Sequence, residues 1–285
     1  MKGYKEITDE IISKLQQGAI PWRRTWKSGL PANAVTQKPY KGINIWLLSD
    51  HKYRSNLWLT FNQTKLLDGI VNKGEHGRQI VYWQIKTRIR EDDLGDEHRD
   101  EVPLLRTYTV FNIEQTTIKM ETETKEFDPI IEAQRIVDGY EDGPEIVSGE
   151  PSYSIELDKI RIPSISSFDS PDEYYSTLFH ELSHSTGHSK RLSRDFKNHF
   201  GSDPYAEEEI ISEMSASFLS GIAGVDVYSK TIENSVAYID HWTKRFADNT
   251  KLIIRLSSQA QKSTDWILGN GQLDGDDQLN NSAQE

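Results

Sequence analysis

The chain has 285 residues, contains no cysteine and carries a formal net charge of −12. The absence of thiols excludes disulfides, thiolate metal sites, iron–sulfur clusters and a cysteine nucleophile, so any metal site must use His, Asp or Glu side chains. No apolar stretch is long enough to span a bilayer and residues 1–10 lack the apolar core of a signal peptide, so we expect a soluble, cytoplasmic protein.

The first third of the chain is basic and rich in tryptophan. Residues 1–90 hold 16 Lys or Arg against 6 Asp or Glu, and five of the seven Trp. Cations neutralise phosphates and rings stack on bases, so this composition favours a single-stranded nucleic-acid surface; core tryptophans beneath a solvated basic surface fit it equally well. Hydrophobic periodicity predicts a helix over 4–17, a helix or strand over 39–49, and strands over 57–61 and 79–90.

The middle of the chain is acidic. Residues 91–150 hold 18 Asp or Glu against 5 Lys or Arg. We expect an acidic loop at 91–103 and a returning strand at 104–112. Residues 126–150 are predicted to be an acidic linker or junction that contains a short helix near 130–138.

The last part of the chain has the signals of a helical region. A strand or hairpin is expected at 153–162. Ser170 followed by Pro171 and two acidic residues is typical of a helix start, and this helix is predicted to end near Thr186. Further helices are expected near 205–221, 231–246 and 250–267, before a polar tail at 270–285.

The first of these helices contains the run His180-Glu181-Leu182-Ser183-His184. Residues i and i+4 project from one face of a helix, so the two imidazoles can bind one zinc ion. Glu181 then lies beside the metal, where it can take a proton from a water molecule and later donate it to a leaving amine. The spacing therefore predicts a metallopeptidase site.

A catalytic zinc needs a third protein ligand. Lys190 stands where a longer HExxHxxGxxH pattern requires His, so that subclass is excluded. The next helix offers Glu209 as the third ligand. Glu213, four residues later, is expected to support a histidine ligand without binding the metal itself. Glu208 and His188 are the alternative ligands.

Several motifs occur in one order along almost the whole chain, over about residues 4–269. They lie at 21–24, 31–44, 58–61, 73–75, 110–112, 180–188, 191–194 and 205–210. With these motifs the chain resembles the ArdC-type antirestriction proteins.

The resemblance implies an α+β protein of two domains. An α+β domain over 1–125 would bind single-stranded DNA, and a mainly helical zincin-like metallopeptidase domain of the gluzincin type (HExxH plus Glu) would occupy 151–269. The linker at 126–150 and the flexible tail at 270–285 complete this division. His180 and His184 fall on the family's metal ligands, Glu181 on its catalytic acid/base and Glu209 in its second-helix acidic motif. Members of the family travel on plasmids and other mobile elements and protect incoming DNA from restriction.

The expected cofactor is Zn²⁺, with Mn²⁺ or Co²⁺ as alternatives for the same donors. The expected partners are single-stranded DNA and a DNA-bound protein substrate, with a restriction enzyme as one candidate, and no membrane. The residues expected to contact DNA are Trp22, Arg23, Arg24, Trp26, Lys27, Tyr40, Lys41, Asn44, Trp58, Lys73 and Arg78.

Three functions remain open at this point. The first is an antirestriction protein that binds single-stranded DNA and cleaves DNA-associated proteins. The second is a non-enzymatic protein that coats single-stranded DNA and has a structural or inactive metal site. The third, a secreted toxin-like protease, is disfavoured by the missing signal peptide and the basic, Trp-rich first third.

Overall fold

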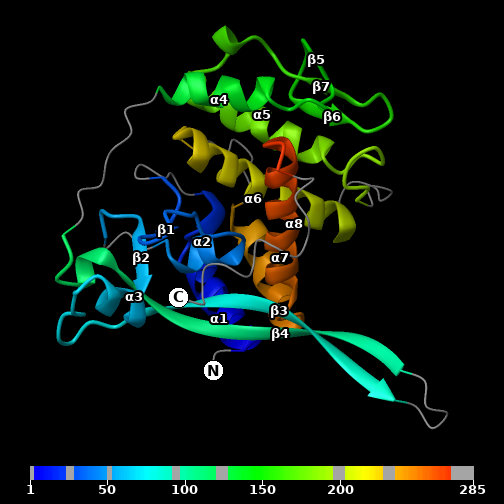
Figure 1. Ribbon diagram of the computed structural model, residues 1–285. Helices are drawn as coiled ribbons and strands as arrows, with labels where there is room; N and C mark the ends of the chain where they lie inside the picture. Colours follow the sequence, from blue (N-terminus) through cyan, green and yellow to red (C-terminus); the bar gives the residue numbers. More distant parts are fainter. Residues whose placement is uncertain are drawn as a thin grey trace.

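The computed structural model describes residues 3–23, 29–49, 53–91, 97–119, 128–194, 203–226 and 235–270. Its fold is α+β, as predicted, with a four-stranded sheet in the N-terminal part and a helical C-terminal part that carries a small second sheet (Figure 1). Within these ranges, no helix combines the length and apolar composition that a membrane span requires.

The N-terminal part combines short helices with a mixed sheet. Its elements are α1 (Tyr4–Gln16), η1 (Pro21–Arg23), β1 (Ala32–Asn33), α2 (Ile43–Leu47), β2 (Leu57–Thr60), α3 (Phe61–Leu66), β3 (Arg78–Glu91), β4 (Glu97–Asn112) and η2 (Ile113–Gln115). The strand order is β1-β2-β4-β3, and only β1 and β2 run parallel. The helix predicted over 4–17 is confirmed as α1, and its apolar stripe of Ile7, Ile11 and Leu15 is buried.

The two long strands β3 and β4 form an antiparallel ribbon whose far end extends beyond the body of the molecule (Figure 1). Pairing runs from Arg78 opposite Val110 to Glu91 opposite Glu97. The acidic loop expected at 91–103 is therefore wrong for residue 91, which belongs to β3, and for residues 97–103, which belong to β4. Residues 92–96 lie outside the described residues. An antiparallel ribbon can expose a face to water, so a run of charged residues does not by itself exclude a strand.

The C-terminal part is built from helices around α6. Its elements are α4 (Pro129–Asp138), β5 (Glu145–Val147), β6 (Ser152–Ser154), β7 (Lys159–Arg161), η3 (Ile165–Ser167), α5 (Pro171–Ser185), α6 (Asp203–Ala223), α7 (Ser235–Asp248) and α8 (Leu252–Ile267). The three short strands pair in the order β5-β7-β6. The predicted hairpin at 153–162 and the four predicted helices are present.

Part of the linker expected at 126–150 is folded into this C-terminal part. Ala133 and Ile136 of α4 are buried in the same cluster as Leu178 and Phe179 of α5, and β5 pairs with β7. The acidic composition had indicated a junction, but the apolar positions of α4 supply a buried face. The boundary expected at residue 125 lies outside the described residues, as does the tail beyond residue 270.

Helix α6 joins two hydrophobic clusters. On one side, Met214 and Phe218 pack with residues of α1, η1, α2, α7 and α8, including Trp22 and Trp46. On the other side, residues such as Leu219 pack with α4, α5, β7 and the end of α8. Figure 1 shows α6 and α8 between the α4–α5 layer and the N-terminal elements. The N-terminal and C-terminal parts therefore share one core, and α6 is held by both.

Candidate metal centre

Helix α5 begins as its sequence predicts. The Ser170 hydroxyl accepts a hydrogen bond from the Glu173 backbone N–H at 3.2 Å, and Pro171 occupies the first helical position. Four residues separate His180 from His184, so both rings lie on one face of the helix. Their Nε2 atoms are 3.0 Å apart.

Helix α6 brings Glu209 to these two histidines. Its Oε2 lies 3.4 Å from His180 Nε2 and its Oε1 lies 3.6 Å from His184 Nε2. A tetrahedral ion about 2.0–2.1 Å from each donor places the donors about 3.3 Å from one another. The three residues, whose donor atoms all lie within 4.8 Å, form the one group of this kind among the described residues. Two imidazoles and one carboxylate therefore fit a divalent metal in both chemistry and spacing.

The electrostatics of the group show how strongly the donors interact. Burial by itself would lower the pKa of His180, but the hydrogen bond with Glu209 and the charges of Glu181, Glu209 and Glu213 raise it to about 9. Burial would raise the pKa of Glu209, but both histidines and the Tyr205 hydroxyl lower it to about 2. The cluster is thus an environment that stabilises positive charge between carboxylates, as a metal site requires.

Glu181 belongs to the same region without being one of the three donors. Its side chain is largely buried. Its charge raises the pKa of His180, and it contributes to the raised pKa of Tyr205, which burial chiefly causes. The carboxylate therefore acts on the donor group from beside it, where the sequence predicts an acid/base.

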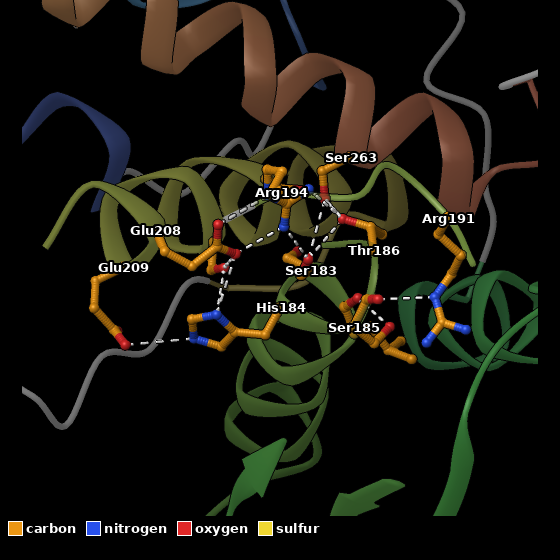
Figure 2. A network of polar contacts seen from close by, with 12 residues as sticks. Ser183, His184, Ser185, Thr186, Arg191, Arg194, Glu208, Glu209 and Ser263 are labelled. Carbon is orange, nitrogen blue, oxygen red and sulfur yellow. Dashed lines mark hydrogen bonds and ion pairs between the residues drawn. The ribbon is translucent and has the colours of Figure 1, made fainter. Parts of the chain in front are cut away.

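Behind His184, a chain of polar contacts leads away from the metal donors (Figure 2). Its Nδ1 lies 2.9 Å from the Ser212 hydroxyl and 3.4 Å from Glu208 Oε1, and Ser212 donates to the same oxygen of Glu208 at 3.4 Å. Arg194 donates to both oxygens of Glu208, at 2.8 and 2.7 Å. With Nδ1 directed at Ser212, Nε2 of His184 is left for the metal.

This arrangement corrects the expectation that Glu208 is an alternative ligand. Glu208 is 5% exposed and both of its oxygens are held by Arg194, on the Nδ1 side of His184. Arg194 also donates to the Thr186 hydroxyl and to the Ser183 carbonyl, at the end of α5. The pair Arg194–Glu208 therefore fixes α5 and α6 relative to each other.

The second alternative ligand, His188, also lies elsewhere. Its Nδ1 accepts a hydrogen bond from the Lys190 backbone at 3.2 Å and lies 3.9 Å from Asp158 Oδ2. It is not a member of the donor group. The turn that ends α5 directs the ring toward the β6–β7 turn, so the structure corrects the expectation that His188 is a ligand.

Glu213 lies one helical turn after Glu209 on α6. Its Oε2 accepts a hydrogen bond from the Trp22 indole at 2.9 Å, and its charge contributes to the raised pKa of His180. Its hydrogen-bond partner is thus a residue of the N-terminal part, and the role of Glu213 in supporting a ligand stays a prediction. Trp22 itself is fully buried. It presents no free ring face to a base, and the expectation that it stacks on DNA is wrong in this structure.

Other residues expected to contact DNA also have internal roles. Trp58 is 1% exposed and packs in a small cluster against which Tyr40 also packs. The Asn44 side chain accepts from the Val81 N–H and donates to the Val81 carbonyl, which joins α2 to β3. Lys41 forms an ion pair with Asp265 of α8 at 3.0 Å. Trp58, Tyr40 and Asn44 therefore hold the fold here and are corrected as primary DNA contacts, whereas the exposed Lys41 stays a prediction.

The remaining expected DNA contacts divide into two groups. Lys73 is exposed in the turn before β3, and Arg78 is partly exposed with Glu10 at 4.0 Å from its guanidinium. Arg24, Trp26 and Lys27, together with the side chain of Arg23, lie outside the described residues.

Sequence reasoning missed three residues that the structure brings to the site. They are Tyr205, which bonds Glu209, and the pair Ser212 and Arg194 behind His184. Tyr205 stands four residues before Glu209, so the helical spacing that selected Glu209 contains the signal for it as well. Arg194 comes from a different segment, and no spacing rule connects it to Glu208.

Comparison with known proteins finds one family model in the N-terminal part of the chain and another in the C-terminal part. Residues 1–111 match the model of the N-terminal domain of the anti-restriction factor ArdC, and residues 133–259 match a zincin-like metallopeptidase model. A DNA primase TraC of Escherichia coli is 31% identical over 99% of this chain, but the matched region is only 28% of that protein. The uncharacterised protein y4eC of Sinorhizobium fredii is 30% identical over 93% of this chain and 91% of its own length.

Solved structures of an ArdC protein also match this chain. The metal-free crystal structure of the antirestriction protein ArdC from plasmid R388 matches with a TM-score of 0.76 and 32% identity, covering 95% of this chain and 98% of that one. The Mn(II)-bound structure of the same protein matches with a TM-score of 0.75 and 31% identity, covering 96% and 99% of the two chains. Taken with the donor group and both domain matches, these likenesses show that the chain belongs to the ArdC family of antirestriction proteins.

Proposed function

We propose that this ArdC-family protein binds single-stranded DNA through its N-terminal part and hydrolyses peptide bonds in DNA-associated proteins at the His180, His184 and Glu209 site. The observation that carries the proposal is the spacing of the three donors, 3.0, 3.4 and 3.6 Å, with the Glu181 carboxylate beside them. A structural site surrounds its metal with four protein ligands, whereas three protein ligands leave a position for water or substrate.

The chemistry can be assigned to residues. His180, His184 and Glu209 would hold a divalent ion, which when bound would lower the pKa of a water molecule and polarise a peptide carbonyl. Glu181 would accept a proton from the attacking water and return it to the leaving amine. The Tyr205 hydroxyl donates to Glu209 and steadies it, while Ser212 and Glu208 fix the ring of His184. Zinc suits this donor set best, and the Mn(II)-bound structure of the R388 relative supports manganese as an alternative.

Single-stranded DNA binding rests on the match to the ArdC N-terminal domain and on the basic charge of residues 1–90. After the corrections above, we assign the contacts to the 23–27 segment, Lys41, Lys73 and Arg78. DNA bound there would raise the local concentration of DNA-associated proteins near the metal centre without any further contact. The relation to a plasmid-borne antirestriction protein supports a role in protecting incoming DNA.

The test compares wild type with Glu181→Gln. Metal content, cleavage of an unfolded substrate protein, binding of a single-stranded oligonucleotide and protection from restriction are measured for both. We expect unchanged metal and DNA binding, with cleavage and protection lost in the variant. Full protection by Glu181→Gln would overturn the peptidase and favour a protein that acts by coating the strand.

A further inference from the structure

All three metal donors come from the C-terminal part, yet one contact reaches this site from the N-terminal part. The indole Nε1–H of Trp22, in η1, donates to Glu213 Oε2 at 2.9 Å. These residues are 191 positions apart in the chain. Glu213 follows Glu209 by four residues on α6, so both carboxylates lie along one face of that helix.

The Trp22 ring is held in place independently of this hydrogen bond. It is fully buried and makes edge-on contacts with Trp46 of α2, at 6.1 Å between ring centroids, and with Phe246 of α7, at 6.4 Å. A ring fixed by its neighbours presents its N–H in a fixed direction. The more adaptable Glu213 side chain, with three rotatable bonds, is therefore the partner whose position the bond decides.

A carboxylate in this position acts on the metal site through its charge. Two neutral imidazoles and one carboxylate leave a divalent ion with excess positive charge, which a second carboxylate nearby stabilises. Removing this N–H takes away one of the contacts that hold the half-buried Glu213 carboxylate at the site.

We propose that Trp22 is a positioning residue of the metal centre: its indole N–H holds the Glu213 carboxylate one helical turn beyond the ligand Glu209, so that the N-terminal part completes a site whose ligands all belong to the C-terminal part. This inference rests on the metal site of the proposed function. It gives Trp22 a role other than the base stacking that its sequence context favoured.

The neighbouring Trp46 provides a matched control. It too is fully buried, and within the described ranges its Nε1 has no hydrogen-bond partner. Trp22→Phe and Trp46→Phe therefore remove the same atoms from the same cluster, but only the first removes a hydrogen bond to Glu213. Any general loosening of the core affects both variants.

The experiment titrates metal-free full-length protein with Mn²⁺ by isothermal calorimetry. We expect Glu213→Gln to weaken binding about tenfold, Trp22→Phe about three- to tenfold, and Trp46→Phe less than about twofold. The double variant Trp22→Phe/Glu213→Gln should bind no more weakly than Glu213→Gln alone, because both changes act through one carboxylate.

The outcomes separate this inference from the proposed function. Equal Mn²⁺ affinity in Trp22→Phe and Trp46→Phe, or additive losses in the double variant, would overturn it while leaving the metal site intact. Wild-type affinity in Glu213→Gln would overturn it even if Trp22→Phe did not fold. Absence of Mn²⁺ and Zn²⁺ binding by the wild type would overturn the metal site itself. None of these readouts depends on peptidase activity.

Discussion

Helix α6 is held by two kinds of contact. Toward the metal site it presents polar groups: Glu208 pairs with Arg194, and Ser212 contacts His184. Toward the N-terminal part it presents apolar groups: Phe218 stacks on Trp46 with ring centroids 4.9 Å apart and planes 20° apart. The polar contacts are directional and made to single atoms, whereas the apolar contacts, which include those of Leu219 with α4 and α5, form broad packed surfaces.

The difference separates two tasks. Hydrophobic burial is large but has no direction, so it places the helix without orienting any one ligand. Hydrogen bonds contribute less net stability, but they fix which atom faces the metal. We therefore expect substitutions of the apolar contacts to lower stability with little effect on metal affinity. Substitutions of the polar contacts near the metal should lower metal affinity with little effect on stability. Glu213, which bonds Trp22, connects the two kinds of contact.

The largest effect is expected from Phe218→Ala. Phe218 is fully buried, and truncation removes the stacking with Trp46 and leaves a cavity. We expect the free energy of unfolding to fall by about 3–5 kcal/mol, measured by urea denaturation of the metal-free protein. Mn²⁺ affinity of the folded variant should stay within about twofold of wild type. A tenfold loss of affinity would show that the apolar contacts also orient the ligands.

A polar contact remote from the metal tests whether polar groups affect stability as well. Arg191, whose side chain is 2% exposed, pairs with Asp158 in the β6–β7 turn. Burial would raise the pKa of Asp158, but hydrogen bonds from Arg191 and Tyr153 hold it below its usual value. The pair therefore stabilises the fold above pH 3.8, the ordinary pKa of the carboxyl, and this contribution is lost as the pH falls through the lowered folded pKa.

Asp158→Asn removes this charge while keeping a residue that tolerates the left-handed backbone of φ 48°. We expect about 2–3 kcal/mol loss of stability at pH 7, because the buried guanidinium loses its counter-charge. The difference from wild type should shrink below about pH 4, and denaturation series at several pH values measure it. A difference independent of pH would mean that packing, not charge, holds this turn.

The smallest effect is expected from Ser212→Ala, with Ser220→Ala as its control. Both hydroxyls are buried on α6, but Ser212 contacts His184, whereas Ser220 has no hydrogen-bond partner within the described ranges. We expect Ser212→Ala to bind Mn²⁺ about tenfold more weakly than wild type, a loss of about 1.4 kcal/mol. Ser220→Ala should bind Mn²⁺ with wild-type affinity. The loss is moderate because Glu208 stays 3.4 Å from Nδ1 of His184. Equal affinities in the two variants would refute the orienting role.

How well a site residue could be predicted from the sequence depends on whether its contacts are local or distant in the chain. His180, His184 and Glu209 were predictable because helical spacing is a local property, and two helices with inward-facing donors suffice to define the group. The DNA contacts were less predictable because Trp supplies both stacking surfaces and core volume. Of the tryptophans predicted to contact DNA, Trp22 and Trp58 are buried in hydrophobic clusters, and composition alone does not distinguish the two roles.

The sequence alone determined the α+β class, the helix that carries the HExxH run and the pair of helices that provide the metal donors, because capping signals and 3.6-residue periodicity act within short segments. Only the tertiary structure decided that Glu208 pairs with Arg194 instead of binding the metal. It also decided that His188 lies near Asp158 and that Trp22 donates a hydrogen bond to Glu213. These partners lie 14, 30 and 191 residues apart. No local pattern links them, and the packing of α6 against both parts of the chain brings them together.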